Sequence, residues 1–400
     1  MKIDKVIAGV EATMGDLLCP KLRQEYRRDE VAKLSLFNSW QLRHRSTLPP
    51  GKRVFGFRWV DTPVKSRLTC QDLKCFDGKK DTTGRVIHCP TPHPISHGLF
   101  QAIAIHRGHY TTYFDVVSAF PHADETDDEI FMEVPQEFFE AHCLECAVSG
   151  LEVPENLHDY VLWMSRTLYG RRNAGAAFRD FFEDCMPKAL VRGDSEPCLY
   201  SNRLQGDEGV NLLHHIDDGK TSATQDETDK VIAHLAVWML LKVSAPQTPT
   251  LGITHLGSIQ IRLESGMVFI SDKKHAEAIY AITGVDKNPP TKFVATPSVK
   301  RWILTDADIV PIEESKASEY RSAVGSAIYL SLEDEMITFA VKELARHLHE
   351  PRECDWSDLI RLAKYLWHHK EDVSVQSIDR GRFRLSMGTA MPIGLERRKI

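Results

Sequence analysis

The stretch YTTYFDVV, residues 110–117, decides the fold, because it has the composition of a buried strand interrupted by one acid. Its β-branched and aromatic residues are typical of an extended element. Just upstream, residues 96–107 carry apolar side chains at helical spacing, and Gly108 supplies a stop signal. The sequence therefore predicts a helix followed by a buried strand, with Asp115 inside that strand.

A second stretch, LLHHIDDGK at residues 212–220, carries an acidic pair. Asp217, Asp218 and Gly219 form a turn signal between two short extended runs, which predicts a β-hairpin with the acids at its tip. A carboxylate in a buried strand is costly unless a positive group compensates it, and a divalent metal is the strongest compensation. From chemistry alone, a solvated turn and an edge-strand aspartate remain alternatives.

Length and composition limit the classes of protein that fit. A chain of 400 residues exceeds one hydrophobic core, so several lobes are expected. No apolar run approaches the roughly 20 residues of a membrane span, and the N-terminus lacks the pattern of a secretory signal. Nine cysteines at irregular spacing favour reduced thiols in an intracellular protein.

The net charge of -6 hides two blocks of opposite sign. Residues 41–85 hold eleven Lys or Arg against four Asp, so this segment could face phosphates. Residues 124–140 hold eight acids and no base. Either block could also be an ordinary solvated face.

Periodicity predicts further elements. Residues 174–191 favour a helix at least to Met186, and residues 226–243 a long helix. A strand pair is expected at 256–261 and 267–270, and a helical lobe from Tyr320 onward.

Six motifs, in this order and spacing, resemble the reverse transcriptase domain of copia-type long-terminal-repeat retrotransposon Pol polyproteins. They are FDVVSAF (114–120), EIFMEVPQEF (129–138), LYGRRNAGAAFRDFF (168–182), HIDDGK (215–220), LGSIQI (256–261) and YRSAVGSAIYL (320–330). The resemblance covers roughly residues 52–370.

The resemblance implies an α+β right-hand polymerase with a ferredoxin-like palm, fingers and a helical thumb. The expected division is an N-terminal extension (1–40), fingers (41–108), a palm (109–270) with a fingers insertion at about 121–200, thumb or connection helices (271–375) and an unassigned tail (376–400). The implied activity is that of an RNA-directed DNA polymerase, which transfers a nucleotide from a dNTP to a primer 3′-hydroxyl in a two-metal reaction. Implied partners are a primed RNA or DNA template, dNTPs and other Pol domains such as integrase or ribonuclease H. No membrane partner is expected. The implied location is the cytoplasm, in a retrotransposon particle, or the nucleus.

Carried over by motif, the resemblance implies that Asp115, Asp217 and Asp218 are the catalytic acids. Together with the backbone carbonyl of Val116, they would bind two Mg²⁺ ions, for which Mn²⁺ could substitute. The remaining site residues implied are Lys65 and Arg67 for the nucleotide triphosphate, Phe120 for the sugar, Asn173 for the nucleotide, and Leu256 and Gly257 for the primer.

Three positions depart from the family. His215 replaces an aromatic residue, Asn173 replaces Gln and Gly175 replaces Pro. These changes leave open a catalytically silent remnant of the same fold that acts only as a nucleic-acid-binding or structural protein. A zinc site is a further alternative, although its spacing is incomplete. Its ligands would come from Cys70, Cys75, His88, Cys89, His93, His97 and the pair Cys143 and Cys146.

Overall fold

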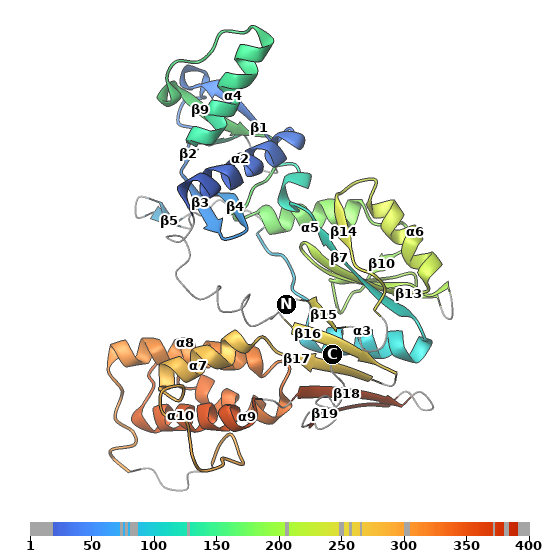
Figure 1. Ribbon diagram of the computed structural model, residues 1–400, viewed down its shortest axis with the longest axis vertical. Coiled ribbons are helices and arrows are strands. Elements are labelled where there is room, and N and C mark those ends of the chain that lie inside the picture. The colour runs from blue at the N-terminus through green and yellow to red at the C-terminus, as the bar shows by residue number, and fades with distance from the viewer. Residues whose placement is uncertain are drawn as a thin grey trace.

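The computed structural model describes residues 19–72, 75–76, 79–80, 87–125, 129–204, 208–247, 252–255, 258–264, 266–299, 305–370, 373–379 and 384–390. These residues form an α+β fold, as predicted, with an upper lobe, a central sheet, a second sheet and a helical bundle (Figure 1). The division into fingers, palm and thumb stays a prediction. Within the described residues, no helix is both long and apolar enough to cross a membrane.

The upper lobe contains a helix that the sequence placed in an N-terminal extension. Its helices are α2 (Pro20–Leu36) and α4 (Gln136–Ser149), and its strands are β1 (Trp40–His44), β2 (Val54–Phe55), β3 (Phe57–Thr62), β4 (Lys65–Cys70), β8 (Ile130–Met132) and β9 (Tyr160–Met164). The strands pair in the order β1-β9-β8-β2, beside a β3-β4 hairpin. Val31 and Leu34 of α2 are buried in one core with Leu68 and Phe138, so α2 is an integral part of this lobe. A separate short pair joins β5 (Cys75–Phe76) to β6 (Lys79–Lys80).

The central sheet has the strand order β10-β11-β12-β13-β7-β14. Its strands are β7 (Tyr110–Val116), β10 (Val191–Arg192), β11 (Leu199–Ser201), β12 (Asn211–His215), β13 (Asp218–Ala223) and β14 (Leu241–Val243), and its helices are α3 (Pro94–Arg107), α5 (Ala174–Asp184) and α6 (Gln225–Leu235). Phe114 packs with Phe178 of α5 and Val231 of α6 on one face. Contacts of α3 with β7, β12 and β13 cover the other face, where Gln101 donates a hydrogen bond to Tyr113.

The second sheet and the bundle complete the molecule. The sheet runs β15 (Gly252–His255), β16 (Ser258–Leu263), β17 (Gly266–Ile270), β18 (Val373–Asp379) and β19 (Arg384–Ala390), and the bundle comprises α7 (Lys273–Thr283), α8 (Glu314–Leu330), α9 (Glu335–Ala345) and α10 (Glu353–His368). Helix α3 joins the two sheets, because Ala102 and Ile105 pack against Met267 and Phe269. Strands β18 and β19 reach into the tail that the sequence left unassigned.

The long helix predicted over residues 226–243 is wrong in its second half. Helix α6 ends at Leu235, and residues 241–243 form β14 instead. The cause is pairing with β7, to which β14 is antiparallel, and the Val117 N–H donates to the Leu240 carbonyl at 2.8 Å. A local helical pattern therefore yields to hydrogen bonds with a strand distant in sequence.

Candidate active site

The structure brings the acids of the two motifs together. Asp115 of β7 and Asp218 of β13 are directly paired across the sheet. On the adjoining strands, Asp218 is also paired with His215 of β12, and Asp115 with Lys242 of β14, so the four residues form one row across the sheet. Directly opposed residues project from the same face of a sheet, so these four side chains share one face. Asp217 precedes the row in the hairpin turn, and its carbonyl accepts the Val116 N–H at 2.8 Å.

The hairpin turn lies earlier than the Asp217-Asp218-Gly219 signal predicts. Asp218 and Gly219 belong to β13, and the turn residues are Ile216 and Asp217. Ile216 has φ of 52°, a conformation that a β-branched residue rarely adopts. Such strain is typical of functional sites.

Gly219 is required for packing rather than for the turn. A Cβ at this position would lie 2.1 Å from the Phe114 ring, which crosses β13 there. Phe114 in turn belongs to the core beneath α5 and α6. The glycine therefore leaves room for the Phe114 ring across β13, directly next to the pair of Asp115 and Asp218.

The charge of Asp115, Asp217 and Asp218 is not balanced by a direct ion pair in the part of the chain that the structure describes. Burial raises the pKa of Asp217, and the charge of Asp115 adds to the effect. Burial, followed by the charges of Asp217 and Asp115, raises the pKa of Asp218 to about 6. A cation bound here would relieve this cost.

The donor set fits a hard cation such as Mg²⁺, because it consists of oxygens. The N–H and C=O of one strand residue face the same edge, so the Val116 carbonyl also faces the hairpin turn. No three Asp, Glu, His or Cys side chains in the described ranges are gathered closely enough to form a finished metal site. Asp115, Asp217 and Asp218 would have to turn toward a shared ion by side-chain rotation.

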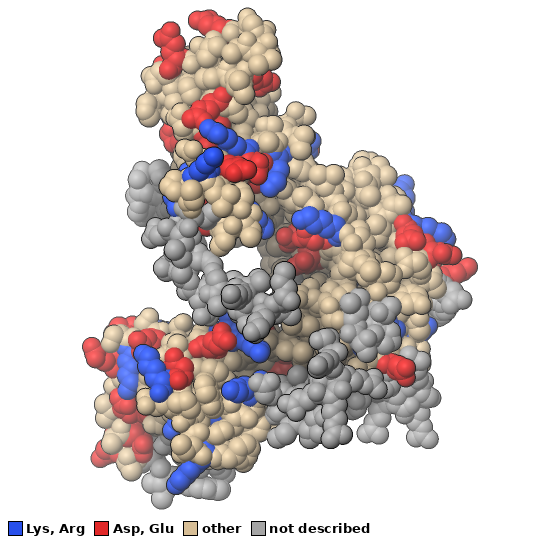
Figure 2. Space-filling view, in the orientation of Figure 1, with Lys and Arg blue, Asp and Glu red and all other residues tan. Residues whose placement is uncertain are grey.

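Basic side chains from the upper lobe approach the acids. The pKa of Lys65 is lowered by burial first and then by the charges of Arg67 and Lys242, while the charge of Asp115 opposes this change. Arg67 likewise acts on the pKa of Asp217. Figure 2 shows acidic and basic side chains at the inner edge of the hollow between the upper lobe and the helical bundle.

Two predicted nucleotide residues lie nearby in different environments. Phe120 opens a 3-10 turn and contacts the Tyr169 ring edge-on, with 5.1 Å between centroids. Asn173 is only 2% exposed and donates to Glu125 Oε1 at 2.8 Å, so its contact with a nucleotide stays a prediction. Leu256 and Gly257 lie outside the described residues.

Sequence reasoning missed two residues at this site. Lys242 lies beside Asp115, but the prediction of a helix there hid its pairing with β7. Tyr169 contacts both Arg67 and Phe120. Its position in the LYGRRN motif was the one signal in the sequence that could have identified it.

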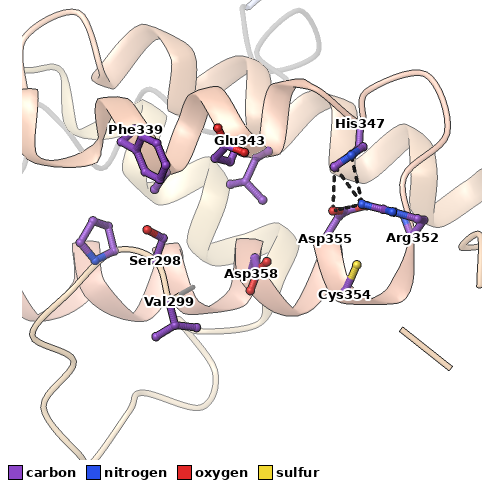
Figure 3. Close-up of a pocket in the computed structure, with 12 residues that line it drawn as sticks. Ser298, Val299, Phe339, Glu343, His347, Arg352, Cys354, Asp355 and Asp358 are labelled. Carbon is purple, nitrogen blue, oxygen red and sulfur yellow. Dashed lines mark hydrogen bonds and ion pairs between the residues drawn. The ribbon is translucent and has the colours of Figure 1, made fainter. Parts of the chain in front are cut away.

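A second acidic cluster lies in the helical bundle, beside a cavity of about 570 Å³ (Figure 3). The Asp355 carboxylate accepts hydrogen bonds from the Arg352 backbone N–H and Nε at 2.9 and 3.0 Å. It also lies 2.9 Å from His347 Nδ1. Burial alone would raise the pKa of Asp355, but these partners outweigh it and the pKa is lowered. This cluster is therefore compensated from within the chain.

Sequence comparison finds relatives among transposon proteins, although no protein-family model matches the chain. The retrovirus-related Pol polyprotein from transposon TNT 1-94 of Nicotiana tabacum is 25% identical over 339 residues, which cover 80% of this chain and 23% of that protein. The corresponding polyprotein from transposon RE2 of Arabidopsis thaliana is 23% identical over 329 residues, covering 80% and 21%. The chain thus spans under a quarter of the length of these relatives.

Among solved structures, a foamy viral protease-reverse transcriptase in complex with double-stranded DNA matches 89% of this chain and 54% of its own, with a TM-score of 0.41 and 9% identity. The sequence comparison confirms the resemblance that the motifs predict. Over four fifths of its length, this chain is similar to the retrovirus-related Pol polyproteins of copia-type transposons.

Proposed function

We propose that the chain is an RNA-directed DNA polymerase that adds deoxynucleotides to a primer 3′-hydroxyl. The observation that carries this proposal is the pairing of Asp115 with Asp218 across the sheet, next to Asp217 of the hairpin turn, with no ion pair to any described residue. Partly buried acids in this state call for an external cation. The sequence similarity to Pol polyproteins supports the same activity.

In this proposal the acidic residues bind metal ions and the basic residues bind the triphosphate. The three carboxylates would hold two Mg²⁺ ions, with Mn²⁺ as a substitute. When bound, such ions supply Lewis-acid stabilisation of the attacking and leaving oxygens in an in-line displacement. Lys65 and Arg67 approach from the opposite lobe and bind the triphosphate of the incoming dNTP, where the fork of Arg67 suits phosphate oxygens.

Positioning accounts for the remaining catalysis. The Phe120 ring abuts the sugar of the dNTP and restricts a ribose 2′-hydroxyl. The primed RNA or DNA template is held mainly through its backbone, so binding weakens as salt rises. No covalent enzyme intermediate is required, because alignment and charge stabilisation suffice. Integrase or ribonuclease H domains of a longer polyprotein are proposed neighbours in a retrotransposon particle or in the nucleus.

Primer extension tests the proposal. Purified chain is mixed with an RNA template, a DNA primer, dNTPs and Mg²⁺ or Mn²⁺, and products are resolved by length. Extension is expected, and Asp217→Asn should reduce its rate by about 10³-fold or more, since a metal ligand contributes several kcal/mol to the transition state. Asp286→Asn changes an exposed acid in the bundle and should leave the rate unaltered.

A folded wild-type chain that extends no primer with either metal would overturn the proposal and leave the silent remnant as the better account. Equal rates for wild type and Asp217→Asn would also contradict it, because the acids would then not carry the chemistry.

A further inference from the structure

Tyr169 lies where the upper lobe meets the central sheet, and the backbone fixes it there. Its carbonyl accepts the Cys70 N–H of β4 at 2.7 Å. The next residue, Gly170, has φ of +82°, and a Cβ on it would lie 2.2 Å from the Cys70 carbonyl oxygen. The chain is thus pressed against the end of β4, so the Tyr169 backbone cannot shift independently of the strand that carries Lys65 and Arg67.

The Tyr169 side chain contacts one residue of the upper lobe and one residue of the turn that follows β7. The Arg67 guanidinium carbon lies 4.9 Å from the ring centroid, which is a cation–π contact. The Phe120 ring meets Tyr169 at an interplanar angle of 72°. Ser118, which has φ of 53°, also acts on the pKa of Tyr169 and lowers it slightly against the effect of burial. Burial raises the pKa of Tyr169 to about 12, so the hydroxyl stays protonated at neutral pH.

Arg67 retains its hydrogen-bonding capacity in this arrangement. Its guanidinium contacts the Tyr169 ring and forms no ion pair with any residue that the structure describes. A guanidinium stacked on a ring keeps its donor edge available. The ring therefore restricts the position of Arg67 without consuming the donors that a triphosphate requires.

We propose that Tyr169 is a positioning residue of the nucleotide site, which holds Arg67 of the upper lobe and Phe120 of the 3-10 turn after β7 at a fixed separation. The proposal rests on the proposed function and adds a residue to it. Tyr169 acts through Arg67 on the triphosphate and through Phe120 on the sugar. Loss of its ring should weaken dNTP binding more than it slows the chemical step.

A double-mutant cycle tests this role in the full chain. Tyr169→Leu should raise the KM for dNTP by about tenfold, in line with the strength of a partly buried cation–π contact, while kcat changes by less than about threefold. Tyr169→Phe keeps the ring and should stay within about threefold of wild type in both. The combined Arg67→Ala and Tyr169→Leu chain should raise KM by less than the product of the two single effects, because Tyr169 acts on the triphosphate through Arg67.

Tyr160→Leu provides a matched control. Tyr160 also lies half-buried in the upper lobe, with its ring 5.4 Å from His44 and 6.1 Å from Phe139, but away from the acids. This variant should lower the melting temperature and leave the KM for dNTP unchanged. Two results would overturn the positioning role. In the first, Tyr169→Leu lowers the melting temperature without changing the KM for dNTP; in the second, the KM effects of Arg67→Ala and Tyr169→Leu simply multiply. Primer extension by the wild-type chain would still uphold the proposed function in either case. Absence of extension and of fluorescent dNTP binding in wild type would instead reject both.

Discussion

Two acidic clusters in this chain, one buried and one partly buried, differ in how their charge is balanced. In the helical bundle, Asp355 is paired with Arg352 and His347, and its pKa is lowered. At the β12-β13 hairpin, Asp217 and Asp218 have raised pKa values and no ion pair with a described residue. The first cluster stabilises the fold by itself. The second is costly to the isolated chain, which is the condition expected where a cation from outside completes the site.

This difference predicts opposite effects of the same substitution. Asp355→Asn should lower the free energy of unfolding by about 2–3 kcal/mol, because the amide presents a donor to Arg352 and removes half of a capping box. Urea denaturation at pH 7 measures this change. An unchanged or raised stability would mean that the bundle cluster is not balanced in the way its contacts indicate.

Lys220 extends the comparison to a buried cation on the same face of β13 as Asp218. It is 0% exposed, and its Nζ has no hydrogen-bond partner among the described residues. Burial lowers the pKa of Lys220 to about 7. Lys220→Met should therefore raise the free energy of unfolding at pH 7 by about 2 kcal/mol.

The pH dependence of Lys220 has a defined sign. The unfolded chain binds this proton up to about pH 10, whereas the folded chain releases it near pH 7. Wild-type stability should thus contain a component that rises from pH 7 to 10, and Lys220→Met should lack it. A variant less stable than wild type, or one with the same pH slope, would contradict this description of Lys220.

Asp218→Asn is expected to have the smallest effect and the opposite sign to Asp355→Asn. The folded-state pKa of Asp218 is about 6, against 3.8 as its ordinary value, so ionisation opposes folding and stability falls as pH rises between these values. Solvent screening reduces the effect, and a gain on the order of 1 kcal/mol is expected at pH 7 without divalent ions. The gain should vanish at pH 4. Destabilisation at pH 7 would indicate that another residue balances Asp218.

Local patterns predicted the elements that carry the acids. Helix α3 and strand β7 follow from apolar spacing, the Gly108 stop and β-branched composition. The hairpin was also predicted, but its turn was misplaced, because Gly219 serves the packing of Phe114 rather than the turn. The identity of a glycine shows that a side chain is not tolerated, without showing which neighbour excludes it.

Contacts between segments that are distant in the sequence could not be predicted from local patterns. Strand β14 forms only because β7 offers a free edge, so Lys242 could not be placed beside Asp115. Tyr169 follows β9, and its meeting with Arg67 depends on how the upper lobe joins the central sheet. The burial of Asn173 against Glu125 likewise arises from segments 48 residues apart.

Titration of the chain with Mn²⁺, followed by electron paramagnetic resonance of the free ion, tests the central claim most directly. The wild-type chain should bind Mn²⁺, and Mg²⁺ should compete. Asp115→Asn and Asp217→Asn should each weaken binding by about tenfold or more, since each removes a charged ligand, while Asp286→Asn should bind as wild type does. If the folded wild-type chain binds no Mn²⁺, or if all three variants bind it as strongly as the wild type does, the claim that these acids form a cation site is contradicted.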